Sequence, residues 1–424
     1  SAAEDHLLHL CVDRDFLCPG QTNMGLFQRG LSCSYGPLGL ELRRNLLDQW
    51  WRSVSTSSAQ VFGIKTLTCS QDPPTGGAGH LGIVDLDDLT QVLVQKGLSR
   101  EELIQQLRER LHRSRLMRTS LYQGALKQFV PSLELANRKL PFGLAETGLC
   151  FQPPGRSGWS PKSMDGPGEA TNTSLVWFCS PRTSGQWLDY WTRQRLKWWR
   201  KFALSPSNFS SAEVPEEELE AVVSRGVRVW YRFPWGQKPV ETLWLRGNAE
   251  LLRTLNGARF TLQGRDGRKT LPHVVTVTGN VDCGMMAFLS NSLQQLKKDN
   301  SKHRLQHRQV LKLHPALAPV KVALEIGRGA TAELRQLCEG LMQELKEAQI
   351  SVWPGYLSTQ ASSMEQLTAK YDEMGVLFTV VISENTLENG LLQVRSRDTT
   401  IKETVHISES RNYIFRYISA AHHV

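Results

Sequence analysis

The sequence predicts an α+β protein whose C-terminal part is a separate domain with a mixed sheet covered by helices. The chain has 424 residues, 40% of them hydrophobic, which suits two or three globular domains rather than one core. From about residue 315 to 424, strand-like apolar runs alternate with helical repeats, the pattern of a mixed sheet under helices. A polar, basic connector at 297–309 precedes this part and marks the boundary between domains.

The first long helix is expected directly after a turn at residues 35–39. This segment reads Tyr-Gly-Pro-Leu-Gly, and proline and glycine are the residues that most often punctuate turns. Beyond the turn, four large apolar side chains recur at helical spacing: Leu42, Leu46, Leu47 and Trp50. We therefore expect a helix with one buried stripe, which lies either in the core of the body or at an interface.

Residues 76–117 are expected to form a helical insertion in the body. Ser and Glu at the two ends of 99–102 have the spacing of a capping box. Leu103, Leu107 and Leu111 then repeat at helical spacing. A short helix pair cannot easily bury such a stripe by itself. The stripe therefore packs either on the body or on a second copy of the chain, as in an intermolecular four-helix bundle.

The elements of the C-terminal domain can be assigned in order. Residues 320–326 and 376–382 have the apolar character of buried strands. Between them, 331–348 carries four leucines at helical spacing, so one face of this helix is expected to point inward. The Asn-Gly pair at 389–390 is expected to form a hairpin turn.

The charge balance of the chain favours a polyanionic partner. The formal net charge is +9 and the sequence pI is about 9.2, a balance common among proteins that bind nucleic acid. No apolar stretch approaches about 18 residues, so no membrane span is expected. The eight cysteines include no Cys-x-x-Cys pair, and we expect neither a zinc site nor disulfides. The chain begins Ser-Ala-Ala-Glu-Asp without a basic or apolar leader, so a targeting peptide is expected to be lacking or already removed.

Nine segments in sequence order resemble glycyl-tRNA synthetase, a class II aminoacyl-tRNA synthetase. The matching segments are 10–19, 35–51, 118–124, 138–152, 190–199, 231–236, 241–248, 271–275 and 311–321. The resemblance implies a class II synthetase-like α+β body, with an antiparallel sheet flanked by helices, formed by residues 1–75 and 118–305. It also implies an anticodon-binding-like α/β domain at 315–424. In this family, the helix within 35–51 lies along the dimer interface.

The residues that carry catalysis in this family are missing. The second motif, Phe-Arg-x-Glu in the family, reads Phe-Gln-Pro-Pro at 151–154, and the arginine that ends the third motif is replaced by Cys283. The family's Arg-Pro-Glu reads Arg-Thr-Ser at 118–120. Arginine suits ATP phosphates because its charged fork binds two oxygens at once. Losing two such contacts costs roughly 3–6 kcal/mol, or about 10²–10⁴ in rate. Unless Arg156 substitutes, no residue of this chain is expected to be catalytic.

A non-catalytic branch of this family fits the pattern: the accessory subunits of mitochondrial DNA polymerases. That resemblance implies a homodimer that binds the polymerase's catalytic subunit and duplex or primer–template DNA and raises processivity. It also implies location in the mitochondrial matrix, at the nucleoid. No cofactor is expected. Two alternatives stay open. One is a working glycyl-tRNA synthetase, against which the missing arginines argue. The other is a non-catalytic tRNA-binding protein, which only the identity of the binding partner would distinguish from a polymerase accessory subunit.

Candidate DNA-binding residues lie in two basic segments. A tryptophan-rich helix carries Arg193, Arg195, Lys197, Arg200 and Lys201. The connector carries Lys297, Lys298, Lys302, Arg304 and Arg308. A Gly-rich hairpin carries a third, smaller set: Arg265, Arg268 and Lys269. Basic side chains among aromatic ones suggest phosphate contact, but a solvated helix face gives the same pattern. No base-reading motif is present, so DNA binding is expected to be independent of sequence.

The tail at 411–418 is the candidate contact with the polymerase, within the domain at 315–424. As a strand, it would place Tyr413, Phe415 and Tyr417 on one face and Arg416 on the other. Aromatic residues and arginine are the types that most often anchor interfaces. These four residues are therefore expected to bind the partner, unless one face of the strand is simply core.

Overall fold

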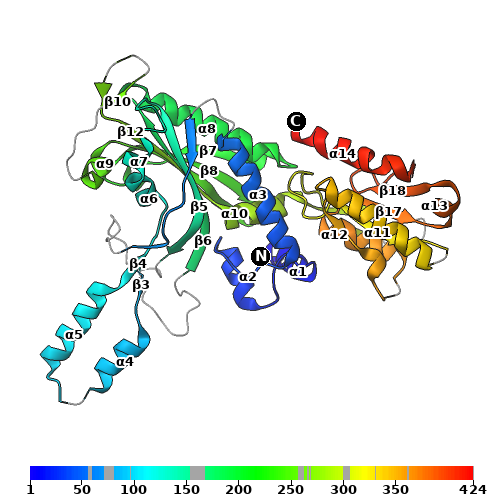
Figure 1. Ribbon diagram of the computed structural model, residues 1–424, viewed down its shortest axis with the longest axis horizontal. Helices are drawn as coiled ribbons and strands as arrows, with labels where there is room; N and C mark the ends of the chain where they lie inside the picture. Colours follow the sequence, from blue (N-terminus) through cyan, green and yellow to red (C-terminus); the bar gives the residue numbers. More distant parts are fainter. Residues whose placement is uncertain are drawn as a thin grey trace.

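The chain folds into three parts. Figure 1 shows a body built on one large sheet, a helical insertion that projects from one end of the body, and a C-terminal domain at the other end. This computed structural model describes residues 1–55, 60–70, 81–95, 97–152, 168–255, 262–264, 267, 269–298, 306–329, 331–360 and 362–423.

The body is built on a seven-stranded sheet that is antiparallel except at one edge. Its strands, in spatial order, are β1 (Gln60–Gly63), β5 (Phe142–Gln152), β6 (Gly168–Cys179), β12 (His273–Asn280), β9 (Gly236–Arg246), β8 (Val223–Phe233) and β7 (Phe209–Glu213). The edge strand β1 runs parallel to β5, and all other neighbours are antiparallel. The antiparallel sheet expected for the body is thus present over six strands, with one parallel addition.

Helices cover both faces of this sheet. One face is covered by α3 (Pro37–Ser55), α8 (Ser184–Lys201) and α10 (Val281–Ser292), and the other by α6 (Tyr122–Lys127), α7 (Phe129–Ser132) and α9 (Ala249–Thr254). Successive side chains of a strand alternate between faces. In β6, Trp177 packs with the α3 layer, whereas Val176 and Phe178 pack with the α6 layer. The body therefore has one apolar core on each side of its sheet.

The stripe predicted for the first long helix is present on α3. Leu42, Leu46 and Trp50 are buried, and Leu47 is partly buried against the same core. Two shorter helices, α1 (Ala2–Asp13) and α2 (Gln21–Gln28), precede it and pack into that core. The spacing of apolar residues in this segment therefore correctly predicted which face of α3 is buried.

The insertion is a pair of helices carried on a small sheet. The sheet has the order β2 (Cys69–Ser70), β4 (Arg115–Met117) and β3 (Gly82–Ile83), and the helices are α4 (Leu86–Val94) and α5 (Arg100–Arg113). The predicted capping box is present, because Ser99 caps α5 and Glu102 reaches back to the Ser99 backbone. Figure 1 shows both helices pointing away from the body.

The C-terminal domain has the predicted mixed sheet. Its strand order is β16 (Val352–Trp353), β15 (Val322–Ile326), β17 (Phe378–Ile382), β18 (Leu391–Ser396) and β19 (Lys402–His406). Strand β15 is parallel to both of its neighbours, while β17, β18 and β19 are successively antiparallel. Helices α11 (Thr331–Glu347), α12 (Met364–Met374), α13 (Glu384–Asn389) and α14 (Ile407–His423) complete the domain.

Two predictions for this domain were wrong. The Asn-Gly pair does not form a hairpin turn: Asn389 ends the short helix α13, and Gly390 caps it with a left-handed φ of 69°. The tail is not a strand but lies within helix α14. In the tail, Tyr413, Ile414 and Ile418 recur at helical spacing and pack against the core. The aromatic residues at every second position, which suggested a strand, therefore do not determine the structure of this segment.

The predicted polar connector contains two paired strands. β13 (Leu293–Lys298) pairs antiparallel with β14 (Gln306–Leu311). The C-terminal domain is also tied to the body by direct contacts. The side-chain amide of Asn45 on α3 donates to the backbone oxygens of Leu317 and Ala318 at 3.1 and 3.2 Å, and Arg14 pairs with Glu373 at 2.5 Å. A further short strand pair, β10 (Leu262–Gln263) and β11 (Lys269–Thr270), lies beside the body sheet.

Candidate functional site

The region that resembles a synthetase active site is a cavity of about 520 Å³ at the base of the insertion. Its lining includes four basic residues: Lys65, Arg115, Arg118 and Lys127. No carboxylate belongs to the lining as described. The cavity is therefore electropositive, and its chemistry depends on how its arginines are used.

Arg118, the one arginine kept from the family's motif, is committed to the protein itself. Its Nε donates to the backbone oxygen of Leu149 at 2.7 Å, and its Nη1 lies 3.2 Å from Oε1 of Glu146. Glu146 is buried and also accepts from the backbone N–H of Thr66 at 2.8 Å. Because several partners hold the guanidinium, Arg118 connects β5 to the segment after β1 rather than presenting a free fork to a phosphate.

The third-motif position is filled by a buried polar cluster. Asp282, at the start of α10, accepts hydrogen bonds from Ser32 Oγ at 2.9 Å, from the Thr171 backbone N–H at 2.7 Å, and from the Tyr35 hydroxyl. Burial raises the pKa of the Asp282 carboxyl, with these hydrogen bonds opposing the shift. The carboxylate is thus used to join α10, β6 and the segment before α3.

Cys283 has none of the properties that an arginine would supply there. It is 4% exposed, and burial raises the pKa of its thiol to about 12, so the side chain is uncharged near neutral pH. A Cβ atom placed on Gly30 would lie 3.3 Å from the Cβ of Cys283, which shows how closely the backbone approaches. Position 283 itself therefore supplies no cation, and its side chain is packed closely against the backbone at Gly30.

The second-motif position also lacks a cation. Gln152 ends β5 and is exposed. Pro153, Pro154 and Arg156 lie outside the described residues. Thus the two positions at which the family carries phosphate-binding arginines hold an amide and a buried thiol. Among the described residues, no cluster of three or more His, Cys, Asp or Glu side chains is arranged to hold a metal ion.

One of the predicted DNA-binding residues, Arg195, is buried, and that prediction was wrong. Its side chain is 2% exposed, its Nε lies 3.0 Å from Oε2 of Glu241, and its Nη1 donates to Ser53 Oγ at 2.9 Å. The guanidinium also lies over the ring of Trp198, 4.4 Å from its centroid. Position 195 falls in helical phase with Leu188 on the inner face of α8, so it cannot reach a DNA phosphate.

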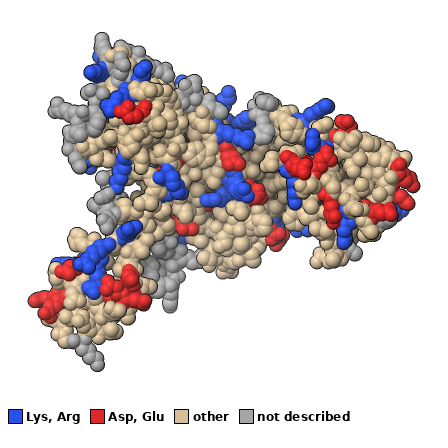
Figure 2. All heavy atoms as spheres, viewed as in Figure 1, with Lys and Arg blue, Asp and Glu red and all other residues tan. Residues whose placement is uncertain are grey.

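The other basic residues of α8 lie on its outer face. Arg193, Lys197, Arg200 and Lys201 are all exposed. Arg200 also donates from Nε and Nη2 to the backbone oxygen of Phe209 at 3.0 and 2.8 Å. In the view of Figure 2, basic side chains predominate over the middle of the body, while acids and bases intermingle on the insertion and the C-terminal domain.

Few of the candidate DNA-binding side chains of the connector lie in the described part of the chain. Lys297 and Lys298 belong to β13, but their side chains are not among those described, and Lys302 and Arg304 lie outside the described residues. Arg308 is placed, and it pairs with the buried Asp372 of α12 at 2.5 Å. It is therefore largely engaged within the C-terminal domain. In the third basic set, Lys269 is exposed on β11, and Arg265 and Arg268 lie outside the described residues.

The apolar stripe of the insertion is not covered by the body. Leu103 and Leu107 are only half-buried, and Leu111 is 54% exposed. Further large apolar side chains of the insertion are exposed as well: Ile83, Leu86, Leu93, Val94 and Ile104. Sequence reasoning missed those on α4, although leucines and valines recur there at helical spacing after the capping residue Asp85. An ion pair from Arg110 to Asp88, at 2.8 Å, holds the two helices together.

The four candidate partner-binding residues of the tail do not share one face. The Tyr413 hydroxyl donates to Glu403 at 2.9 Å, and the Tyr417 hydroxyl donates to Asp398 at 2.5 Å. Both rings pack against Phe378. Phe415, 52% exposed, and Arg416 point away from the sheet. The helix therefore leaves Phe415 and Arg416 as the outward pair.

None of the helices in the described part of the chain is both long and apolar enough to cross a bilayer. All eight cysteines, each of which the structure describes, are free thiols. Burial raises the thiol pKa at several of them, including Cys179 and Cys338, each to about 12. The thiols of Cys179 and Cys338 are therefore uncharged near neutral pH.

Comparison with known proteins links the fold to two groups. Residues 317–416 match the family model described as "Anticodon binding domain". The chain is also similar along its length to glycine–tRNA ligases, for example 26% identical to that of Streptomyces coelicolor, with 97% of each chain covered. The synthetase-like motifs and the C-terminal domain predicted from the sequence agree with these matches.

Much closer relatives carry a different name. The chain is 48% identical to "DNA polymerase subunit gamma-2" of Mus musculus, an alignment that covers 100% of this chain and 92% of the relative. It is 46% identical to "DNA polymerase subunit gamma-2, mitochondrial" of Xenopus laevis, covering 99% of this chain and 88% of the relative. Because similarity at this level extends over essentially the whole chain, the protein belongs to the DNA polymerase subunit gamma-2 family.

Proposed function

We propose that this chain is a non-catalytic accessory subunit of mitochondrial DNA polymerase, a homodimer that binds the catalytic subunit and duplex primer–template DNA and increases processivity. Its membership of the gamma-2 family supports this function. The observation that carries the non-catalytic part is the cluster around Asp282 and Cys283, where a buried thiol stands in place of a phosphate-binding arginine. A working glycyl-tRNA synthetase would need that cation.

Dimerisation through the insertion is supported by its exposed apolar side chains. Leu93 and Leu111 are 64% and 54% exposed, on helices that Figure 1 shows projecting into solvent. Two copies packed as a four-helix bundle would bury this surface at about 25 cal/mol per Å² of apolar area. Helix α3 is the second proposed element of the interface, since the resembling family uses it in this way.

DNA binding is proposed for the outer face of α8 and for the connector. On α8, Arg193, Lys197 and Lys201 are spaced four residues apart on the exposed side of the helix. Contacts from such side chains to phosphates release counterions and carry no sequence information. The proposed binding is therefore salt-dependent and independent of sequence. Arg195 and Arg308 have no part in it, because each is held in an internal ion pair.

Contact with the catalytic subunit is proposed for the C-terminal domain. This domain matches a family model of an anticodon-binding domain. A domain of this kind no longer needs to bind tRNA once the chain has stopped charging tRNA. Its helix α14 presents Phe415 beside Arg416 on the outside. A large aromatic ring next to a guanidinium is a combination that often anchors interfaces. The proposed site of action is the mitochondrial matrix, at the nucleoid.

Primer extension on a long, singly primed template tests this function. The catalytic subunit is assayed with and without the chain at fixed enzyme concentration. Longer products per binding event are expected when the chain is present, because the accessory subunit holds polymerase and DNA together. Unchanged product length, together with specific retention of tRNA on the same preparation, would instead favour a tRNA-binding protein.

A further inference from the structure

A second cavity, separate from the synthetase-like one, lies at the N-terminal end of α8. It has a volume of about 420 Å³, within the range of small-ligand sites. Its lining residues are Leu140, Pro141, Ser180, Arg182, Thr183, Gln186, Trp187 and Tyr190. All of them belong to the described part of the chain, and none carries a carboxylate.

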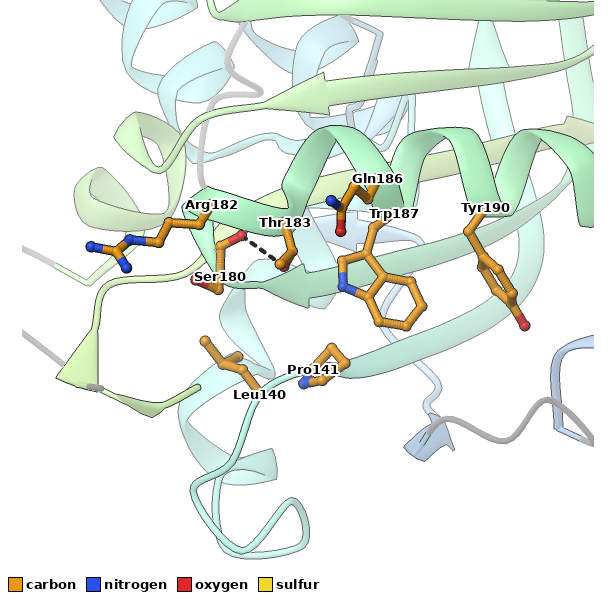
Figure 3. A pocket seen from close by; sticks show the side chains of 8 residues that line it. All are labelled: Leu140, Pro141, Ser180, Arg182, Thr183, Gln186, Trp187 and Tyr190. Atoms are coloured by element: carbon orange, nitrogen blue, oxygen red, sulfur yellow. Dashed lines mark hydrogen bonds between the residues drawn. The ribbon is translucent and has the colours of Figure 1, made fainter. Parts of the chain in front are cut away.

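The cavity combines an aromatic wall with a polar and basic rim. Figure 3 shows the Trp187 ring extending from α8 toward Pro141, the Tyr190 ring further along the helix, and Arg182 beside Ser180 at the opposite end of the site. The Trp187 ring is held in place by Trp177, whose centroid is 4.9 Å away, and by Tyr190 at 5.3 Å. The indole therefore has a fixed orientation, as a surface for stacking requires.

The cavity is continuous with the basic outer face of α8. Along this face, side chains follow one another at helical spacing from the cavity toward the C-terminal end of the helix: Gln186, Tyr190, Arg193, Lys197 and Lys201. The acid on this side, Asp189, pairs with Arg225 at 2.8 Å, and Arg225 also pairs with Glu213 of β7. From Tyr190 to Lys201 the stripe runs about 16 Å, or roughly five nucleotide steps of one DNA strand.

We propose that this cavity holds one unpaired nucleobase of a DNA strand whose phosphates follow the basic face of α8. The inference rests on the DNA binding proposed above and adds the class of nucleotide that this face recognises. A base within a duplex is covered on both faces by its neighbours, so only a base at a frayed end or an overhang can enter. Every base has a π face, and stacking on Trp187 is therefore expected to be tolerant of sequence.

The charge around the cavity favours a nucleotide over an apolar side chain of a protein partner. Arg182 stands at the rim, and Arg193 and Lys197 continue the basic surface beyond Tyr190. A backbone phosphate complements this surface, whereas an uncharged aliphatic anchor would leave it unused. Ser180, Thr183 and Gln186 add hydroxyl and amide groups that can pair with a base edge or a sugar.

The test compares a blunt DNA duplex with the same duplex carrying a short 3′ overhang that contains 2-aminopurine. We expect tighter binding of the overhang form and quenching of the 2-aminopurine fluorescence when the dimer binds. Trp187→Leu should lower affinity for the overhang about five-fold or more, the lower end of what one stacked base contributes. It should leave affinity for the blunt duplex within about two-fold, and Trp187→Phe should retain most of the preference.

Because Trp187 packs on Trp177, thermal unfolding of each variant is measured first. If Trp187→Leu is unstable, Tyr190→Leu, which alters the other aromatic wall, takes its place with the same expected loss. Binding to the blunt duplex without preference or quenching would overturn the nucleobase site while leaving the proposed DNA binding intact. Absence of binding to both DNAs would remove both proposals. Loss of polymerase binding with unchanged overhang preference would assign the cavity to a protein side chain instead.

Discussion

Arg195 on α8 and Glu241 on β9 form an ion pair in the core of the body, with Nε 3.0 Å from Oε2 and side chains that are 2% and 0% exposed. The same carboxylate accepts from Trp199 Nε1 at 2.8 Å. One acid therefore accepts hydrogen bonds from an arginine and an indole on successive turns of the helix. This pair fixes which face of α8 points inward and leaves the other basic residues of the helix outside.

Removing one partner of this pair is expected to destabilise the body. Glu241→Ala leaves the Arg195 guanidinium buried without a counter-ion, which should lower the free energy of unfolding by about 3–5 kcal/mol. Urea denaturation, monitored by tryptophan fluorescence, measures this free energy of unfolding. Glu213→Ala is the control, because Glu213 pairs with Arg225 at the surface and is 56% exposed. That variant should change stability by less than about 1 kcal/mol. Equal effects would show that burial does not decide the outcome.

The chain is expected to form no aminoacyl adenylate. Cys283 is a buried, uncharged thiol and Gln152 is neutral, so neither supplies a cation to ATP phosphates. Two missing contacts of this kind are worth roughly 10²–10⁴ in rate. Glycine-dependent exchange of pyrophosphate into ATP is the measurement, with an authentic glycine–tRNA ligase as the positive control. Turnover clearly above background would contradict the assignment.

Charges placed on the exposed face of the insertion are expected to weaken the dimer. Leu93→Glu combined with Leu111→Glu puts four carboxylates into the proposed bundle, and the dimer dissociation constant should rise at least about ten-fold. Light scattering across a dilution series gives the constant. Leu135→Glu serves as the control, since Leu135 is 62% exposed but lies on the body. An unchanged mass for the double variant, or for a chain lacking 80–115, would place the interface elsewhere.

Reversing charge on the outer face of α8 is expected to flatten the salt dependence of DNA binding. Each phosphate contact contributes about −0.9 to the slope of log affinity against log salt. Arg193→Glu with Lys197→Glu should therefore make the slope less steep by about 2. The matched control, Arg335→Glu with Lys346→Glu, makes the same change in net charge on α11 and should leave the slope unchanged.

The connector is tested separately by reversing Lys297, Lys298 and Lys302. A flatter slope for that variant would assign phosphate contacts to the connector as well. If neither this variant nor the α8 variant alters slope or affinity, DNA binds at another surface.

The outward pair of α14 is expected to contribute to polymerase binding. Phe415→Ala with Arg416→Ala should weaken affinity for the catalytic subunit by about 2 kcal/mol or more, as loss of an interface anchor does. Tyr413→Phe is the control, since it removes only a hydrogen bond to Glu403 within the domain. Affinity is measured by titration with the catalytic subunit, and dimer mass is checked in parallel. Full stimulation of long-product synthesis by a dimer truncated before residue 315 would move the contact to the body.

The sequence by itself determined the elements whose signal is local. Leu42, Leu46 and Trp50 gave the buried face of α3, because a helix that packs on a core must repeat apolar residues every three to four positions. Leu334, Leu341 and Leu345 did the same for α11. The mixed sheet of the C-terminal domain and the helical insertion were also predictable. Replacement of the family's arginines by Gln152 and Cys283 could be read directly from the aligned motifs.

Only the tertiary structure decided which charged and aromatic residues are available for binding. Arg195 forms an internal ion pair with Glu241, 46 residues away, and Arg308 forms one with Asp372, 64 residues away. The tail is helical rather than extended because its isoleucines and Tyr413 meet a sheet formed by distant strands. Likewise, the second cavity exists because Pro141 lies opposite Trp187. The sequence shows where charged residues lie and which face of a helix they share. Whether such a side chain is buried or exposed depends on residues that are distant in the chain.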